Sequence, residues 1–157
     1  FATSTDITLS ATGYATSTSY LTIPAGTFTA SSTIKFNSNF QCTSSSGTGS
    51  CYVYLRNSNG VEFWNTGNID AAAGQTLNMT NETRTFMNGS TSAQRSLGEF
   101  VQLSGYAAAG SAGTGGIVES TSSINLANAL TFAVVLRFTN GGTGSATLYN
   151  YSIEVNP

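Results

Sequence analysis

Apolar residues recur at every second position along much of this chain, which is typical of β-strands that bury one face. In residues 33–41, Ile34, Phe36 and Phe40 alternate with polar residues. The same alternation in residues 130–138 and 147–155 predicts two further strands. A Gly-rich segment separates them, so we expect them to pair as a β-hairpin that closes the fold.

Shorter alternating runs predict the remaining strands, and turn-forming residues separate them. Pro24-Ala25-Gly26 and Asn57-Ser58-Asn59-Gly60 are the strongest turn signals, because Pro fixes φ and Asn-Gly tolerates positive φ. No segment has a sustained helical period. The further predicted strands are residues 6–10, 20–23, 51–56, 61–64, 75–80, 97–106 and 116–119. About eight to ten antiparallel strands at this spacing indicate an all-β sandwich or barrel.

The alternation also predicts the core and the domain organisation. Residues 20–157 form one β-sandwich domain, and residues 1–19 form a polar N-terminal arm or strand. In the arm, Asp6, Ile7 and Leu9 mark a short strand suited to pairing with a partner subunit. The expected core residues are Ile34, Phe36, Val53, Leu55, Phe132, Val134, Leu136 and Ile153.

Composition narrows the classes of function. The chain has no His, only 8% charged residues and a net charge of -2. Because His is the usual acid–base group near neutral pH, we expect no enzyme, no catalytic residues and no cofactor. The negative net charge disfavours nucleic-acid binding. The spacing of acidic and Asn residues matches no metal-binding loop, and no apolar run approaches the roughly 20 residues that cross a bilayer, so we expect no metal and no membrane insertion.

Two cysteines, Cys42 and Cys51, flank a turn-forming segment rich in Ser and Gly. A hairpin would place them opposite each other, so a disulfide is the favoured interpretation, and it would indicate an oxidising or extracellular setting. The alternative is a pair of free thiols that act as small apolar residues.

Aromatic residues offer one candidate ligand surface. Trp64, Tyr52 and Tyr54 lie on short predicted strands beside polar residues, and flat aromatic rings supply stacking area for sugars. The competing interpretation, which we favour for Trp64, is that the single Trp of a β-sandwich belongs to its core.

Several segments resemble one family. The Ile-Pro-Ala-Gly-Thr turn at residues 23–27, the strand at 51–56 and the closing segment that ends in Glu154-Val155 are similar to the jelly-roll domains of tailed-bacteriophage virion proteins. Such domains occur in capsid decoration proteins and in head and tail fibres. The resemblance implies an antiparallel jelly-roll β-sandwich that forms a homotrimer on the virion surface and contacts the major capsid protein or other virion proteins. The cysteine pair is a departure from the family pattern.

Two other functions fit the same residues. One is a self-polymerising, pilus-like filament subunit at a cell surface, whose N-terminal strand completes the sheet of a neighbour. The other is a carbohydrate-binding module or receptor-binding fibre tip that contacts a host surface glycan through Trp64 and its neighbours.

Overall fold

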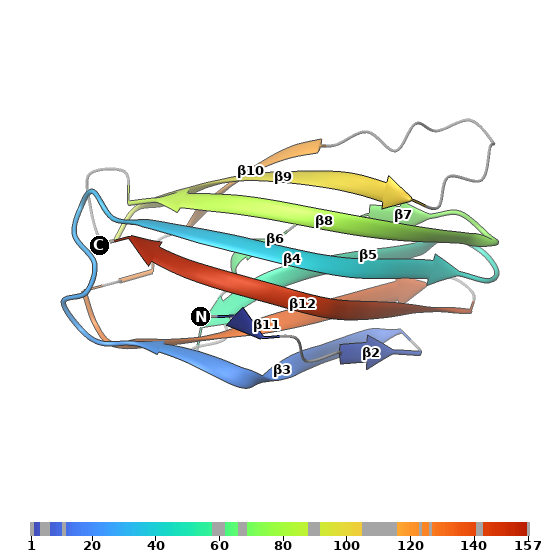
Figure 1. The fold of residues 1–157 in the computed structure, drawn as a ribbon, viewed down its shortest axis with the longest axis horizontal. Helices are drawn as coiled ribbons and strands as arrows, with labels where there is room; N and C mark the ends of the chain where they lie inside the picture. Colours follow the sequence, from blue (N-terminus) through green and yellow to red (C-terminus); the bar gives the residue numbers. More distant parts are fainter. Residues whose placement is uncertain are drawn as a thin grey trace.

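Two antiparallel sheets packed face to face form the fold (Figure 1). The computed structural model describes residues 2–3, 7–10, 12–57, 62–65, 69–87, 92–104, 116–122, 124–125, 127–140 and 143–156. The seven-stranded sheet contains β1 (Ala2–Thr3), β2 (Ile7–Leu9), β4 (Thr33–Ser44), β8 (Gln75–Phe86), β9 (Gln94–Ser104), β10 (Gly116–Ser122) and β12 (Gly144–Asn156). The five-stranded sheet contains β3 (Gly13–Ile23), β5 (Gly49–Asn57), β6 (Glu62–Asn65), β7 (Ile69–Ala71) and β11 (Leu130–Asn140).

The order of the strands is that of a jelly roll. The seven-stranded sheet runs β1–β12–β4–β8–β9–β10, with β2 also paired to β12. The five-stranded sheet runs β3–β11–β5–β6, with β7 also paired to β5. The chain crosses repeatedly between the sheets, from β3 to β4, from β4 to β5 and from β11 to β12, as in double-sheet jelly rolls. The predicted fold class is therefore confirmed, and β9 and β10 extend the larger sheet beyond β8.

The number of strands differs from the expected eight to ten, because the described residues contain twelve. Two of the additional strands are β1 and β7, which have two and three residues. Runs this short cannot show a period of two, so an alternation pattern does not reveal them.

The predicted closing hairpin is wrong. β11 pairs with β3 and β5 in the smaller sheet, whereas β12 pairs with β4, β1 and β2 in the larger one. The last two long strands therefore face each other across the core. Alternation shows that each strand buries one face, but it does not show which sheet the strand joins. The connection over residues 141–143 links the two sheets instead of turning back within one.

The predicted apolar stripe of β12 is also partly wrong. The stripe was expected to continue through Thr147 and Tyr149, but the buried residues before the middle of the strand are Ala146 and Leu148. The register against β4 shifts between Leu148 and Asn150, so the inward face moves to the odd-numbered residues from Tyr151 onward. This β-bulge leaves Tyr149 37% exposed.

The core lies between the two sheets and contains all of the predicted core residues. Each of the eight is at most 2% exposed: Ile34, Phe36, Val53, Leu55, Phe132, Val134, Leu136 and Ile153. In β4, burial alternates along the whole strand as the sequence predicted. Apolar area removed from water on both inner faces is the main stabilising term of such a sandwich.

Toward β9 the interior becomes polar, which the apolar pattern could not indicate. Asn81 donates from Nδ2 to the Ser38 hydroxyl at 3.1 Å, and the hydroxyls of Thr85 and Ser96 are 2.8 Å apart. The buried side chain of Gln94 bonds to both the N–H and the C=O of Ile124, at 2.9 and 2.8 Å. These buried groups satisfy one another, so their burial carries no large desolvation penalty.

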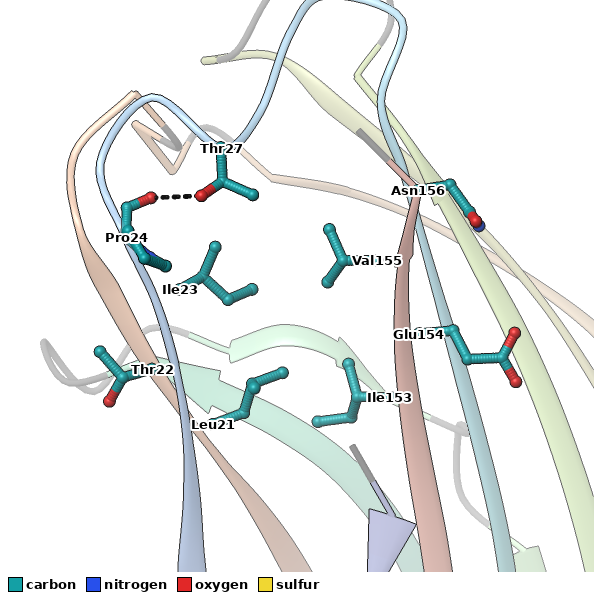
Figure 2. A pocket seen from close by; sticks show the side chains of 9 residues that line it. All are labelled: Leu21, Thr22, Ile23, Pro24, Thr27, Ile153, Glu154, Val155 and Asn156. Atoms are coloured by element: carbon teal, nitrogen blue, oxygen red, sulfur yellow. Dashed lines mark hydrogen bonds between the residues drawn. The ribbon is translucent and has the colours of Figure 1, made fainter.

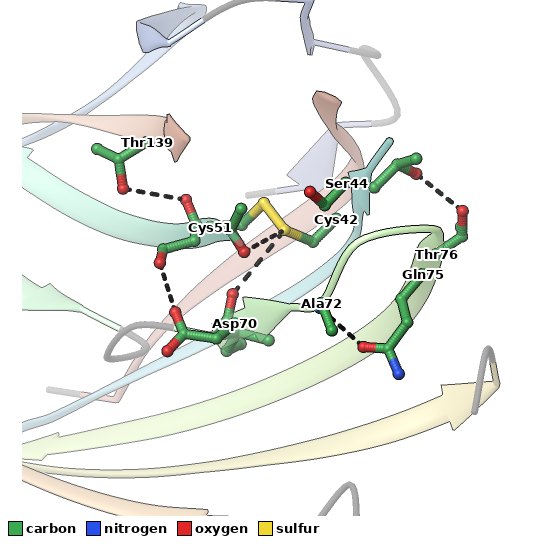
Figure 3. The surroundings of a disulfide bond; sticks show 12 residues. Cys42, Ser44, Cys51, Asp70, Ala72, Gln75, Thr76 and Thr139 are labelled. Atoms are coloured by element: carbon green, nitrogen blue, oxygen red, sulfur yellow. Dashed lines mark hydrogen bonds between the residues drawn. A yellow bond between two sulfur atoms is a disulfide. The ribbon is translucent and has the colours of Figure 1, made fainter. Parts of the chain in front are cut away.

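The disulfide between Cys42 and Cys51 is confirmed, but it is not a link across a hairpin. Cys42 lies on β4 and Cys51 on β5, which belong to opposite sheets, so the bond joins the two layers of the sandwich (Figure 3). The Cα atoms are 5.9 Å apart, and both residues are fully buried. Beside them, a Cβ at Gly49 would lie 3.0 Å from a ring carbon of Phe138 on the neighbouring strand β11 and 3.2 Å from Ser44 Cβ on β4, so glycine avoids tight contacts with both sheets at this position.

The N-terminal arm pairs within its own chain. β2 aligns with residues 146–148 of β12, and Ile7 and Leu9 pack partly buried against the core. Asp6 lies outside the described residues. β3 extends from Gly13 to Ile23, across the expected boundary between residues 19 and 20.

Loss of the disulfide should lower stability measurably. The cysteines are nine residues apart, and closing a loop of this size stabilises by about 2.5 kcal/mol in the chain-entropy description. We expect the Cys42→Ala/Cys51→Ala double variant to lose roughly this free energy of unfolding in guanidinium titrations. Dithiothreitol should destabilise the wild type and leave the double variant unchanged. Equal stability of oxidised and fully reduced wild type would contradict this expectation.

Candidate functional site

An apolar groove opens at the edge of the sandwich where β3 and β12 face each other. It encloses about 520 Å³. Leu21 and Ile23 of β3 point toward Ile153 and Val155 of β12 (Figure 2). The polar groups Thr22, Glu154 and Asn156 point away from this apolar interior and form the rim.

The turn after β3 shapes one end of the groove. Thr27 closes it through two bonds to the Pro24 carbonyl, from its backbone N–H at 3.4 Å and from its hydroxyl at 2.8 Å. Gly26 has a φ of 75°, which L side chains rarely adopt, and its N–H donates to the carbonyl of Ala127. The predicted turn at residues 24–26 is therefore confirmed.

Both strands that border the groove have backbone edges without a strand partner among the described residues. On its outer edge, β12 pairs with β1 at Tyr151 and Ser152 and with β2 at residues 146–148, and no described strand pairs there with residues 154–156. β3 is the terminal strand of its sheet. Unpaired N–H and C=O groups beside an apolar groove are what an added strand requires, because the edge supplies hydrogen bonds and the groove receives alternate side chains.

The outer face of the larger sheet has a different character, since its polar side chains bond to one another across the strands. Cross-strand hydrogen bonds join Asn37 to Ser152, Asn39 to Asn150, Gln41 to Asn78, and Thr43 to Thr76. These amide and hydroxyl groups satisfy much of their own bonding capacity, so the face offers few free donors or acceptors to a ligand.

Three charged residues on this face form one ion-pair cluster. The Glu82 carboxylate lies 3.1 Å from Lys35 Nζ and 3.0 Å from an Arg84 guanidinium nitrogen. The hydrogen bond from Lys35 is the largest influence on Glu82. Together with Arg84 it outweighs partial desolvation, so the pKa of this carboxyl lies below its ordinary value of 4.5.

The outer face of the smaller sheet contains the aromatic residues that the sequence singled out. The Tyr52 and Tyr54 rings pack with their centroids 5.6 Å apart. Arg137 lies over the Tyr52 ring, 5.1 Å from its centroid, and donates to the Tyr52 hydroxyl. Tyr54 is only 6% exposed, so it supports Tyr52 from within the face. The backbone of Trp64 is registered with Leu55, and the Trp64 side chain is outside what the structure describes.

Sequence analysis therefore identified some of the residues on the outer face of the smaller sheet, but not the groove between β3 and β12. Tyr52 and Tyr54, which the sequence singled out as possible stacking residues, have ring centroids 5.6 Å apart, and their role in ligand binding stays a prediction. Sequence reasoning missed Arg137 as the companion of Tyr52, and it missed the groove. The alternating pairs Leu21/Ile23 and Ile153/Val155 were visible signals, but only the topology shows that these strands border one edge.

The described residues hold no group of three or more His, Cys, Asp or Glu side chains placed to bind a metal ion. In the same part of the chain, no helix has the length and apolar character that a membrane crossing needs.

Comparisons with known proteins add only distant structural similarities to the topology described above. No protein-family model and no curated protein matches the chain. Among solved structures, the chain is similar to a seed lectin of Lotus tetragonolobus at 8% identity, with a TM-score of 0.41 and coverage of 91% of this chain and 80% of the lectin. It is also similar to lectin I-B4 of Griffonia simplicifolia, at 8% identity, with a TM-score of 0.43 and coverage of 99% and 91%. A third is the VP2 subviral particle of infectious bursal disease virus, at 9% identity, with a TM-score of 0.37 and coverage of 99% and 31%. Similarity at this level carries no information about function.

The charge cluster on the larger sheet makes a small, pH-dependent contribution. Because the folded pKa of Glu82 is lowered, its stabilisation is present above the ordinary value of 4.5 and is lost as pH falls through the folded value. The side chain is 42% exposed, so we expect less than about 1 kcal/mol. In urea titrations, Glu82→Gln should be slightly less stable than wild type at pH 7, and the two should converge below pH 4.5. A difference that stays constant with pH would contradict this assignment.

Proposed function

We propose that the chain is a non-enzymatic structural subunit of a virion, a trimeric jelly roll that decorates the capsid or forms part of a fibre. The observation that carries the proposal is the edge formed by β3 and by residues 154–156 of β12, which has no further strand partner among the described residues and lies beside the groove of Leu21, Ile23, Ile153 and Val155. The setting comes from the resemblance of the sequence to jelly-roll domains of tailed-bacteriophage virion proteins.

The proposed occupant of the groove is a neighbouring copy of this chain. An exposed strand edge beside apolar side chains is prone to uncontrolled pairing, and soluble monomers usually protect such edges with charges. Among the described residues that line the groove, Glu154 is the only charged one, in a chain with 8% charged residues. Ile23 and Ile153 are already buried within the subunit, so coverage by another subunit removes the exposed edge and buries what remains exposed of Leu21 and Val155, which together favour a closed oligomer.

The buried disulfide supports a location outside the reducing cytosol, such as a virion surface. Lys35, Glu82 and Arg84 are paired with one another on the outer face of the larger sheet, which leaves this cluster with little to offer a substrate. These two features agree with a structural role.

A charge placed in the groove tests the proposed interface. Sedimentation of the wild type should give three times the monomer mass of 16.2 kDa. Val155→Lys should shift the protein to monomer at the same concentration, because an ammonium group cannot be buried there without a partner. Tyr149→Lys is the matched control on the same strand. It changes an exposed residue outside the groove and should leave the trimer intact.

Thermal unfolding of both variants shows whether the fold is retained. A wild type that stays monomeric over the accessible concentration range would overturn the proposal. A folded Val155→Lys protein that assembles like the wild type would overturn it as well.

The arrangement of the arm favours one competing function, a strand-exchanging surface filament. β1 and β2 hold the β12 edge through only two and three residues, so the arm could transfer to a neighbour. Deletion of residues 1–12 separates the two functions by electron microscopy and sedimentation. A closed trimer should persist after the deletion, although with lower stability because Ile7 and Leu9 no longer pack on the core. Filaments in the wild type that disappear after the deletion would favour the filament and contradict the virion trimer.

A further inference from the structure

A second surface, independent of the groove, lies on the outer face of the smaller sheet, where β7, β5 and β11 are adjacent. Ser50 on β5 is registered with Asp70 of β7 and with Thr139 of β11. Two residues further along β5, Tyr52 is registered with Arg137. Cys51 and Phe138, which lie between these residues in the sequence, face the core. The side chains that share the outward face are therefore Ser50, Tyr52, Asp70, Arg137 and Thr139.

Neighbouring strands hold the polar ends of these side chains in place. The Ser50 hydroxyl donates to Asp70 Oδ1, and the Thr139 hydroxyl donates to the Ser50 carbonyl at 3.4 Å (Figure 3). The Arg137 guanidinium donates to the Tyr52 hydroxyl and lies over its ring. Side chains restrained in this way lose less conformational entropy when a ligand binds.

The two opposite charges on this surface remain unneutralised. Asp70 and Arg137 are both exposed, and no ion pair joins either of them to another described residue. The outer face of the larger sheet is the contrast, because Lys35 and Arg84 both pair there with Glu82. A guanidinium has five N–H donors, and Arg137 directs one toward Tyr52. Most of its bonding capacity, and one oxygen of Asp70, therefore remain available to a ligand.

We propose that Asp70, Tyr52 and Arg137 form a binding site for one neutral pyranose unit of a glycan. Sugar hydroxyls both donate and accept, so they can bond to a carboxylate at one end and to a guanidinium at the other. Tyr52 is half-buried and Arg137 lies over one face of its ring, so the part of the ring that stays exposed offers an apolar contact to the C–H groups of a sugar. The two rows of side chains are about 7 Å apart along the strands, and Asp70 on β7 and Arg137 on β11 flank β5 at two strand spacings, about 10 Å, a span that the hydroxyls at opposite ends of one sugar ring can bridge through a hydrogen bond at each end.

The charge pattern selects the class of ligand. Polyanions such as nucleic acids or strongly acidic glycans would meet the Asp70 carboxylate, which repels them. Arg137 alone would suit an anion, but the carboxylate on the same face favours a neutral, hydroxyl-rich ligand. The site does not depend on assembly through the groove, because its residues belong to β5, β7 and β11 and not to the groove lining.

A printed array of neutral and acidic glycans, followed by calorimetry with the best neutral oligosaccharide, tests the site. We expect binding of at least one neutral glycan by the wild-type protein. Tyr52→Ala and Arg137→Ala should each weaken it by about tenfold or more, as expected when a charged hydrogen bond or an aromatic contact is lost. Asp70→Asn should also weaken it, since the amide can accept from a sugar hydroxyl but carries no charge.

The larger sheet provides matched controls, in which Tyr149→Ala and Arg84→Ala remove the same residue types from its outer face. Both should bind like the wild type, and melting temperatures show that all variants fold. The proposal is overturned if the wild type binds no glycan on the array, or if binding survives both Tyr52→Ala and Arg137→Ala. Binding restricted to acidic glycans and strengthened by Asp70→Asn would also overturn it. The trimer mass should be the same in all of these variants, so failure here is distinct from failure of the proposed assembly.

Discussion

The structure depends on the burial of one face of each long strand against the opposite sheet. β11 shows this most clearly, because its inward residues Leu130, Phe132, Val134, Leu136 and Phe138 are all apolar and almost fully buried, and in β4 every second residue is buried. The jelly-roll crossings bring these strands together from distant parts of the chain, and the disulfide between β4 and β5 fixes the layers to each other at one end. The placement of every outward-facing residue follows from this arrangement, because the side-chain period of a strand leaves no freedom once one face is buried.

Much of the fold could be predicted because a strand that buries one face shows a local alternation of apolar and polar residues in its sequence. Ile34 and Phe36 mark a buried face within a few residues, and all the core residues selected on this basis are buried. The cysteine pair was also visible, because a short flexible segment joins two strands that each end in Cys. No comparable local pattern shows to which of the two sheets a strand belongs. For this reason the last two strands looked like a hairpin, although they lie in opposite sheets.

In two strands, the residues that face the interior differ from a strict alternation, and each difference has a specific physical cause. In β12 a bulge near Tyr149 moves the buried face from even to odd positions, and a strict period of two cannot represent this shift. In β9, Ser96 points inward and Leu97 is 45% exposed, because the interior there is a hydrogen-bonded polar cluster. The groove could not be predicted because it requires β3 and β12 to border the same edge. Arg137 was missed because its contact with Tyr52 joins positions 85 residues apart.

The two outer faces show how the same backbone can support different roles. On the larger sheet, amide and hydroxyl pairs and the Lys35–Glu82–Arg84 cluster satisfy one another, so that surface has little left to offer a partner. On the smaller sheet, Asp70 and Arg137 are oriented by neighbours, and neither forms an ion pair with another described residue. An edge groove for assembly and a separate face for a glycan can therefore coexist in one subunit, because strands of a sandwich expose edges and faces in different directions.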